Sequence, residues 1–495
     1  MDSLAAPTIP RWLAAVLALV SLSHPSQGQC EVDRLRPRSP VAGFGANIAV
    51  EGNLAVMGAP GDFGDGKAHV FRHDGLRWRE EQELLAGNGL IAFDCALSGN
   101  TILIGGSFFD RTAYAFVHDG TRWNLQQALG APGSEATDAF GTRVRLDGDT
   151  AVVSAQLEDT ATARDSGAAY VFVRSGTAWS LQQRLAPNDA AEFDTTGPCA
   201  IAGDEILLGS PGKRAVYVFR RAGAVWTQVQ KLTSSNDSRS FGRRIARDGD
   251  RAVIASFEDD FSGAAFVFEK QGGLWVERQK LIASDRRQSA IFGFSLDLSG
   301  DALVIGSDRP VSSGPIAPYL FRRQASGWAE SARLTPSVPP RRDAAEVAID
   351  GNKILVGGHG SDEVVLDFRL LDGSLQSFNG RGVNADVLVT SAAATGQPWS
   401  AAISVVAPRG PGSAYVLVTD RCQSGVLVGR RAEYLLAGRP LLLLGPVPHT
   451  GQGSLVPFAT SVPVTPAFLG QQWAAQGIVW DGTLGLTNAI ASVVR

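Results

Sequence analysis

One short turn recurs seven times along the chain, and no other feature restricts the possible fold as strongly. In each copy a glycine precedes Asp or Asn and is soon followed by an aliphatic run. The seven glycines are Gly52, Gly99, Gly148, Gly203, Gly249, Gly300 and Gly351. They follow one another at intervals of 46 to 55 residues. A near-constant period of this length, kept over seven copies, indicates an array of structural repeats.

Four short strands are predicted within each period. In the third period they cover 140–146, 151–154, 168–173 and 179–185, separated by two glycine turns and one polar loop. Glycine tolerates the positive φ angles that tight hairpins require. One antiparallel sheet of four strands cannot bury both of its faces, whereas seven such sheets packed radially can. We therefore predict an all-β chain that contains a seven-bladed β-propeller of four-stranded antiparallel blades, with an open solenoid as the rival architecture.

A tryptophan marks the fourth strand of six repeats, at Trp78, Trp123, Trp179, Trp226, Trp275 and Trp328. These side chains are expected to pack between neighbouring blades, and the alternative is a ring that stacks on a ligand. The seventh repeat lacks the tryptophan. The segment 31–37 resembles a fourth strand and precedes the first repeat, so we predict that it completes the last blade. Asp372-Gly373-Ser374-Leu375 is the competing candidate for that strand.

The first 28 residues are typical of a secretory signal peptide. Arg11 precedes a short apolar run, 12–22, and small residues at Ser26 and Gly28 place a cleavage site before Gln29. About eleven apolar residues are too few to span a bilayer, which needs about 20. The alternatives are a disordered tail, a membrane anchor, or lipidation at the following cysteine. No later stretch is apolar over the length that a membrane span requires.

The composition changes after the last repeat. Residues 29–371 are assigned to the propeller and 372–495 to a second domain with little charge and more Pro, Gly, Ala and Val. Aliphatic runs bounded by Gly and Pro predict short strands there, and a small β-sandwich-like domain is expected. These runs are 385–389, 401–406, 414–418 and 441–444. The pattern Leu486-Thr487-Asn488-Ala489 resembles the end of C-terminal domains on other secreted bacterial proteins, where surface attachment or structural capping are the possible roles.

The sequence contains few residues that indicate catalysis. The net charge is −4 and the Lys and Arg residues are scattered, which argues against nucleic acid as a partner. There is no His-x-x-His or His-Glu-x-x-His pair and no Gly-x-Ser-x-Gly elbow. His73 and His118 are expected to be repeat variants on hairpins, and His69 a rim or core residue. His359 stands in the most irregular context, but a lone loop histidine is usually only exposed.

The four cysteines show no metal-ligand spacing. Cys95 and Cys199 each lie four residues before a repeat glycine, where other repeats have aliphatic residues. They are expected to be buried and unpaired, because they belong to blades that are not neighbours. Cys30 and Cys422 could form a disulfide between the two domains, which export would permit.

With these residues in view, the chain resembles FG-GAP repeat proteins, whose propeller is also that of the integrin α-subunit head. The Phe-Gly element stands at Phe44-Gly45, Phe140-Gly141, Phe241-Gly242 and Phe292-Gly293. The Gly-Ala-Pro element stands at Gly58-Ala59-Pro60 and, altered, at Gly209-Ser210-Pro211. Bacterial members also carry strands like Tyr170-Val171-Phe172 and like Trp226 with Gln230 and Leu232. The resemblance covers about residues 30 to 371 and implies a propeller with a secreted or surface location, but no single activity.

Members of this family often bind calcium in loops of the type Asp-x-Asp-x-Asp-Gly. The corresponding loops here depart from that pattern and supply fewer oxygens than the six to eight that calcium prefers. The weak candidates are Asp62, Asp65, Glu158, Asp159, Asp165, Glu258, Asp259 and Asp260. Solvation of exposed loops is the simpler interpretation, so no metal or other cofactor is assigned, and calcium stays possible.

Taken together, these observations predict a secreted or cell-surface propeller that acts as a non-catalytic binding or adhesion module. An extracellular protein or a glycan is the expected partner. The alternatives are a structural or interaction scaffold without a small ligand, and an extracellular enzyme that acts on polysaccharide. Propellers host catalysis as well as binding, so the fold alone does not decide among them.

Overall fold

A computed structural model of the chain describes its strands and most of its connections. The described residues are 30–61, 66–75, 77–85, 92–106, 111–285, 291–308, 317–334, 345–358, 365–369, 376–378, 387–390, 398–404, 412–428, 432–449, 455–461, 472–480 and 484–493. Several predictions fall outside them, namely the signal segment 1–28, Asp62, Asp65, His359 and the alternative closing strand 372–375. The described residues include no helix long and apolar enough to cross a membrane.

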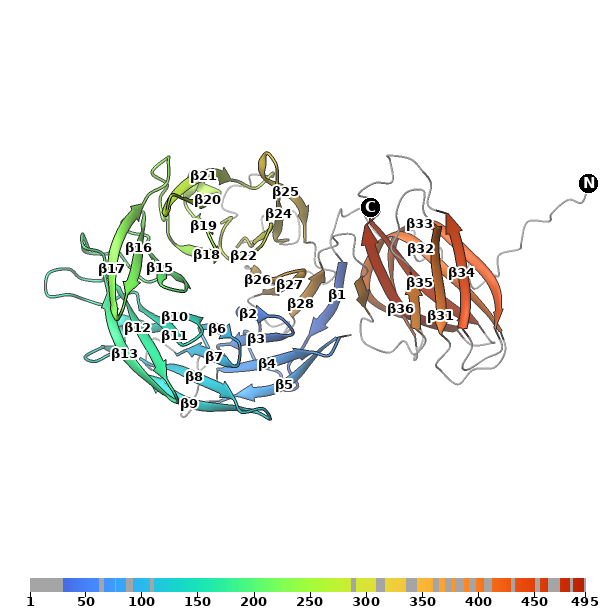
Figure 1. The fold of residues 1–495 in the computed structure, drawn as a ribbon, viewed down its shortest axis with the longest axis horizontal. Coiled ribbons are helices and arrows are strands. Elements are labelled where there is room, and N and C mark those ends of the chain that lie inside the picture. The colour runs from blue at the N-terminus through green and yellow to red at the C-terminus, as the bar shows by residue number, and fades with distance from the viewer. Residues whose placement is uncertain are drawn as a thin grey trace, which may run out of the picture. The chain divides into compact units, whose positions relative to one another are not determined.

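The N-terminal part is a seven-bladed β-propeller in which each blade is a four-stranded sheet (Figure 1). The strands of the first three blades are β2 Asn47–Glu51, β3 Leu54–Ala59, β4 Lys67–His73 and β5 Trp78–Leu84; β6 Asp94–Ser98, β7 Thr101–Gly105, β8 Ala113–His118 and β9 Trp123–Leu129; and β10 Phe140–Asp147, β11 Thr150–Ala155, β12 Ala168–Ser175 and β13 Ala178–Leu185. Those of the next three are β14 Cys199–Ala202, β15 Glu205–Ser210, β16 Ala215–Ala222 and β17 Val225–Leu232; β18 Arg244–Asp248, β19 Arg251–Ser256, β20 Ala264–Gln271 and β21 Leu274–Leu281; and β22 Leu296–Ser299, β23 Ala302–Ile305, β24 Tyr319–Gln324 and β25 Gly327–Arg333. The fold class predicted for this part is confirmed, and the solenoid is excluded.

The seventh blade takes its fourth strand from the N-terminal end of the propeller. Its sheet has the order β1-β28-β27-β26, with β1 Cys30–Leu35, β26 Ala345–Asp350, β27 Lys353–Gly358 and β28 Val365–Arg369. The segment predicted to close the ring therefore does so. A strand from one end of the repeat array completes the blade at the other end, so no blade is left with three strands.

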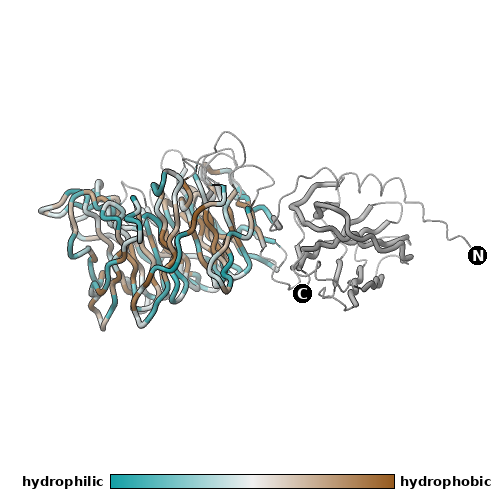
Figure 2. Tube along the Cα trace, turned by 90° about the horizontal axis from the view of Figure 1, so that it is seen from above, coloured by the Kyte–Doolittle hydropathy of each residue, from teal (hydrophilic) through white to brown (hydrophobic). Residues whose placement is uncertain are grey.

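Apolar side chains fill the spaces between blades. Trp123 of the second blade packs in one buried cluster with Leu54 and Val56 of the first, and Trp179 of the third packs with Leu103 and Leu129 of the second. In Figure 2 apolar residues lie along the strands of the propeller, and polar residues lie at many of its turns. The tryptophans are therefore inter-blade core residues, as predicted, and they do not form a stacking ring for a ligand.

The Phe-Gly element of one blade and the second-strand glycine of the preceding blade, where the Gly-Ala-Pro element lies, meet between the two blades. A glycine in the last two residues of the second strand of one blade lies against the backbone of the Phe-Gly glycine in the next, as in Gly209 against Gly242 and Gly105 against Gly141. A Cβ atom built on the first glycine of either pair would overlap the carbonyl oxygen of the second. The motif is therefore a site of backbone-to-backbone packing, where any side chain is too large.

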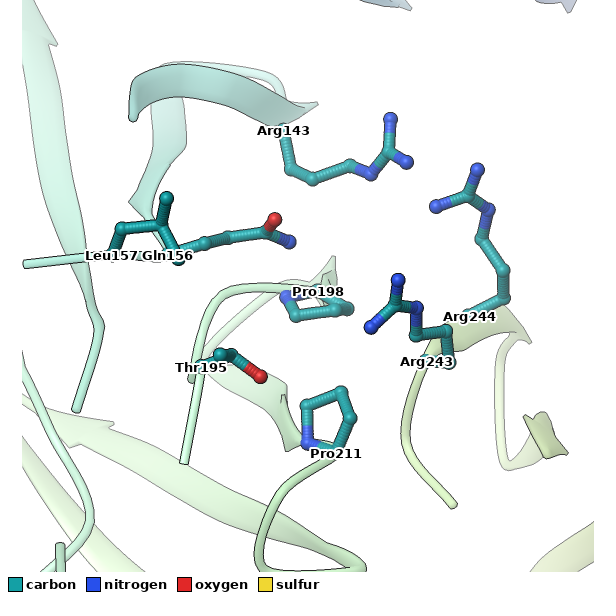
Figure 3. A pocket seen from close by; sticks show the side chains of 8 residues that line it. All are labelled: Arg143, Gln156, Leu157, Thr195, Pro198, Pro211, Arg243 and Arg244. Carbon is teal, nitrogen blue, oxygen red and sulfur yellow. The ribbon is translucent and has the colours of Figure 1, made fainter. Parts of the chain in front are cut away.

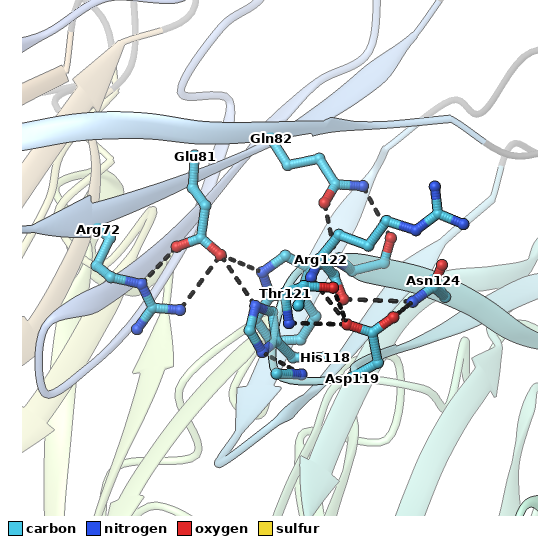
Figure 4. Close-up of polar contacts among 10 residues, drawn as sticks. Arg72, Glu81, Gln82, His118, Asp119, Thr121, Arg122 and Asn124 are labelled. Atoms are coloured by element: carbon cyan, nitrogen blue, oxygen red, sulfur yellow. Dashed lines mark hydrogen bonds and ion pairs between the residues drawn. The ribbon is translucent and has the colours of Figure 1, made fainter.

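A glutamine clamp joins the outer strands of neighbouring blades. The side-chain Nε2 of Gln82 donates to the carbonyl of Trp123 at 2.8 Å, and its Oε1 accepts from the amide of Trp123 at 2.8 Å (Figure 4). Four later glutamines make the same pair of hydrogen bonds to the next tryptophan. These are Gln127, Gln183, Gln230 and Gln279. The recurring fourth-strand glutamine is thus an inter-blade connector.

Hydrogen bonds also join the turns between the first and second strands of neighbouring blades, and this ring of bonds is called the belt. In six of the seven turns the side chain of the residue before a repeat glycine accepts a hydrogen bond from the repeat glycine of the following blade, as Asp147 Oδ2 does from the amide of Gly203 at 2.6 Å. The same contact links the last blade to the first, where Asp350 Oδ2 accepts from the amide of Gly52 at 2.6 Å. The belt therefore passes across the point where the ring closes.

Replacing Gln230 with alanine tests the clamp. The change leaves the amide and carbonyl of Trp275 without their side-chain partner, so we expect the free energy of unfolding to fall by roughly 1–3 kcal/mol. Urea unfolding followed by tryptophan fluorescence measures this. Thr227→Ala, at an exposed position of the same strand, is the matched control. Equal losses in the two variants would mean that the clamp adds no net stability.

Beyond the propeller the described residues are all in strands. The compact unit of the propeller ends at Asp367, and the strands after it are β29 Gln376–Phe378, β30 Val387–Thr390, β31 Pro398–Ser404, β32 Gly412–Val428, β33 Ala432–His449, β34 Leu455–Ser461, β35 Gln472–Trp480 and β36 Leu484–Val493. They form sheets of the order β29-β36-β35-β32-β33 and β30-β31-β34.

The runs 414–418 and 441–444 are parts of much longer strands. They lie in β32 and β33, which pair with register shifts such as those around Thr419, opposite Pro440. Proline and glycine therefore interrupt the ladder as bulges and do not end the strands. The β-sandwich-like packing of this domain stays a prediction.

Candidate binding pocket near the propeller axis

A pocket of about 240 Å³ lies where the inner strands of blades three and five begin. Its lining residues come from blades three, four and five (Figure 3) and are Arg143, Gln156, Leu157, Thr195, Pro198, Pro211, Arg243 and Arg244. Arg143 lies within β10 and Arg244 is the first residue of β18, so the innermost strands fix the positions of their backbones. The pocket is therefore built on rigid elements.

The fourth blade supplies the wall between the arginines. Pro198 and Pro211 lie beside strands β14 and β15, and Thr195 comes from the connection that enters this blade. That connection holds Phe193 and Thr195 at φ angles of 61° and 49°, in the left-handed region that non-glycine residues rarely adopt. It also lies in the longest interval between repeat glycines, from Gly148 to Gly203. The repeat is therefore modified where the pocket forms.

Aromatic rings hold two of the arginines in place. The guanidinium of Arg243 lies 5.8 Å from the ring centroid of Phe257, and that of Arg244 lies 5.6 Å from the ring of Phe294. The two rings are stacked, with centroids 6.1 Å apart. Arg244 Nε also donates to the carbonyl of Phe294 at 3.0 Å. These contacts orient the cations without neutralising them.

The three arginines repel one another. Burial and then the charge of Arg143 lower the pKa of Arg243, and the same two causes, in that order, lower the pKa of Arg244 to about 9. Arg244 therefore stays protonated at neutral pH, close to a like charge. Arg143 Nε is buried and has no hydrogen-bond partner among the described residues. An anion in this pocket would relieve the repulsion.

Carboxyl groups lie on other inner strands. Asp94 accepts from Arg145 at 2.9 Å and from the amide of Val144 at 3.0 Å. Burial raises the pKa of Asp297 to about 6, against the effect of backbone amides that donate to it. Burial likewise raises the pKa of Glu346 to about 7, and attraction to Arg244, Arg143 and Arg145 only partly opposes this.

Glu346 makes the stability of the propeller depend on pH. Its pKa in the folded chain, about 7, lies above the ordinary value of 4.5, so the folded state keeps a proton that the unfolded state releases in this window. Stability from this group therefore falls as pH rises from 4.5 to about 7. We expect Glu346→Gln to unfold like the wild type at pH 4.5 and to be more stable by up to about 3 kcal/mol at pH 8.

Urea unfolding of both proteins at the two pH values measures this difference, and comparing variant with wild type cancels the titration of all other groups. A variant that is less stable than the wild type at pH 8 would show instead that the ionised carboxylate stabilises the arginines around it.

The calcium candidates that the structure describes are largely engaged by cationic side chains or by backbone amides. Glu158 Oε1 lies 2.6 Å from Arg184 Nε, and Asp159 Oδ1 accepts from the amide of Asp165 at 2.7 Å. Asp165 itself pairs with Arg164 at 3.3 Å. A cation in this loop would have to compete with the protein's own arginines.

The corresponding loop of the fifth blade is held in a similar way. Asp259 lies 2.5 Å from Lys280 Nζ and accepts from Asn236 and Ser238, and these bonds outweigh burial and lower its pKa. Asp260 lies in the 3₁₀ turn η2 Asp259–Phe261 at φ 47°. Glu258, next to this turn, is exposed. Within the described ranges, no three His, Cys, Asp or Glu side chains are grouped as metal ligands. Calcium binding at these loops stays a prediction.

The histidines that the structure describes make structural contacts. His118 ends β8, accepts from the amide of Gly120 at 3.2 Å and lies 3.3 Å from Glu81 of the first blade (Figure 4). His69 is buried, with Nδ1 2.8 Å from Glu80. The predicted hairpin and core positions are therefore correct.

Cys95 and Cys199 are buried and free, as predicted. Burial raises the pKa of both thiols, that of Cys199 to about 12, which leaves them protonated and unreactive. Cys30 and Cys422 lie in β1 and β32, and their pairing stays a prediction because their side chains are outside the described part.

The pocket arginines were not predicted as site residues, although the sequence contains a signal for two of them. Arg143 and Arg244 both stand five residues before a repeat glycine. Other repeats have Asn47, Asp94, Pro198, Ser295 and Glu346 at this position. Alignment of the repeats on that glycine would have shown two like charges on inner strands that flank one blade.

A comparison with known families identifies the repeat from which the propeller is built. The model of the FG-GAP repeat matches residues 123–172, 226–268 and 275–315. The first two matches begin at a fourth-strand tryptophan and end in the third strand of the next blade. The chain thus carries FG-GAP repeats, and they build a seven-bladed β-propeller.

No curated protein matches the chain. Similar solved structures include Sqt1 of Saccharomyces cerevisiae, with 11% identity, a TM-score of 0.42, and coverage of 70% of this chain and 100% of that one. YCF48 bound to D1 peptide shares 13% identity over 70% of this chain and 97% of its own, with a TM-score of 0.45. A chain of the mitotic checkpoint complex shares 12% identity over 75% and 98%, with a TM-score of 0.47.

Proposed function

We propose that this protein is a secreted or cell-surface binding module, with a role in adhesion, and that its ligand occupies the pocket between blades three and five. The observation that supports this is the composition of the pocket. Its eight lining residues offer guanidinium, amide and hydroxyl groups for recognition. They include no carboxylate, imidazole or thiol, the groups that most often perform acid–base or nucleophilic catalysis.

The partner is an extracellular protein or glycan in this proposal. The signal-like segment 1–28 supports export, and the strand-rich part after residue 371 would attach or cap the module as a β-sandwich-like domain. A pocket of about 240 Å³ admits one group of a larger molecule, so the remainder of the partner would contact the loops around it.

Retention of the purified full chain on immobilised polysaccharides and extracellular proteins tests the proposal, with calcium or a chelator in parallel runs. Each retained glycan is then analysed for new reducing ends. Retention without product supports the binding module. Product release would favour a polysaccharide-active enzyme, and no retention on any surface would favour a scaffold. Loss of retention with the chelator would assign calcium a role.

A further inference from the structure

Three guanidinium groups converge on the pocket from two blades (Figure 3). Arg143 reaches it from the third blade, and Arg243 and Arg244 reach it from the fifth, with the fourth blade between them. Each guanidinium presents several N–H donors in a planar fork, which matches the oxygens of a carboxylate, sulfate or phosphate.

None of the three forms an ion pair with an acidic side chain among the described residues, and the charges of Glu346 and Glu258 act on Arg244 and Arg243 only at longer range. Other arginines of the propeller are paired, such as Arg145 with Asp94 at 2.9 Å and Arg174 with Asp149 at 2.6 Å. No carboxylate oxygen of a described residue lies within ion-pair distance of Arg143, Arg243 or Arg244, which distinguishes them from these pairs. Unpaired cations this close together raise the free energy of the empty site and favour an anion in it.

The donors are also positioned before any ligand arrives. Phe257 and Phe294 lie beside Arg243 and Arg244, and a backbone carbonyl fixes Arg244 Nε. Arg143 Nε is buried without a partner, so a donor is already desolvated at the site. Binding therefore requires little reordering of the side chains.

We propose that the pocket binds an oxyanion group of the ligand, a carboxylate, sulfate or phosphate, between Arg143, Arg243 and Arg244. This inference rests on the proposed binding function and names the chemistry of its ligand. The cavity of about 240 Å³ holds the volume of roughly eight water molecules. It therefore accepts the anionic group with a few attached atoms, and Gln156 and Thr195 supply neutral polar contacts to them.

Isothermal titration of the full chain with sodium sulfate, sodium phosphate and sodium glucuronate, at constant ionic strength, tests the proposal. Glucose is the neutral probe. We expect saturable binding of at least one anion and none of glucose, and the tightest of the three identifies the group. Arg143→Gln and Arg244→Gln should each weaken that binding about ten-fold or more, because each removes a charge-assisted donor pair.

Arg239→Gln is the matched control. It removes a positive charge from the exposed connection that leads to β18 but does not line the pocket, so it should change affinity less than about two-fold. Equal weakening in all three variants, or no binding of any anion by the folded protein, would overturn the proposal. Retention on a macromolecule that survives both pocket variants would overturn the oxyanion site and leave the binding function intact. Anion binding by a protein that no macromolecule retains would support the oxyanion site and overturn the proposed binding function.

Discussion

Replacing Gly209 with alanine is expected to destabilise the propeller by at least about 3 kcal/mol, although the change adds a single methyl group. Gly209 is the last residue but one of β15, the second strand of the fourth blade, and its Cα faces the carbonyl of Gly242 in the fifth. A Cβ at this position would overlap that oxygen far inside van der Waals contact, and the carbonyl of Pro198 lies 3.2 Å away.

Neither backbone can easily move away. The amide of Gly209 donates to the carbonyl of Pro198 at 2.6 Å, and the amide of Gly242 donates to that of Ala255 at 3.2 Å. Gly242 itself has a φ of 96°, where only glycine is unstrained. The blades would therefore have to separate, which would open the buried cluster of Val216, Phe241 and Phe266.

Gly203→Ala separates this effect from the general cost of losing a glycine. Gly203 lies in the same blade at φ 55°, but a Cβ there meets no atom within 4 Å. The expected loss is about 1–2 kcal/mol, from the left-handed backbone alone. Urea unfolding of both variants measures the difference. A loss in Gly209→Ala no larger than in Gly203→Ala would mean that the inter-blade contact is looser than the structure shows.

The propeller was predictable because its constraints are local and recur. Each repeat glycine, fourth-strand tryptophan and Phe-Gly element has one structural reason, which applies in every blade that carries it. What the repeat could not decide was the strand that closes the ring, since both 31–37 and 372–375 have suitable patterns. The structure answers this with β1, next to β28. The fourth-strand pattern of 31–37 made it the predicted closing strand, but a pairing that depends on the whole ring could not be decided against 372–375 from sequence.

The pocket was not predictable in the same way. The acidic loops were the weak calcium candidates in the sequence, because carboxylates that lie close together along the chain suggest a cation site. The partners of Glu158 and Asp259 are Arg184 and Lys280, on fourth strands that follow later in the chain. Arg143 and Arg244 belong to blades separated by an entire blade, and only the curvature of the ring brings their side chains together. Arg143 and Arg244, which break the repeat, are therefore the residues by which the sequence indicates the pocket.

The second large effect concerns the closure of the ring. Leu35→Ala is expected to reduce the free energy of unfolding by about 2–5 kcal/mol, as for other fully buried leucines. Leu35 is the last residue of β1 and only 1% exposed. It packs in one cluster with Phe44 and Met57 of the first blade and Leu355 of the seventh. The truncation would leave a cavity at the interface that joins the two ends of the array.

Deletion of residues 30–35 should have a stronger effect than the point substitution. The seventh blade would keep three strands, and β28 would become an open edge that can pair with other chains. Two contacts that span the closure depend on this blade, from the amide of Gly52 to Asp350 and from Trp78 Nε1 to Asp367 at 2.9 Å. We therefore expect the deleted chain to aggregate or to lose its cooperative transition.

Arg36→Ala is the control, since Arg36 is the exposed neighbour of Leu35 and should change stability by less than about 0.5 kcal/mol. Urea unfolding compares the two substitutions, and light scattering follows the deletion. If Leu35→Ala unfolds like Arg36→Ala, and the deleted chain stays monomeric and cooperative, the six complete blades are stable without closure. The propeller would then behave as an open repeat array, in which stability is a sum over neighbouring blades. If both changes act as expected, the first and last repeats are one folding unit, joined by a strand from the opposite end of the array.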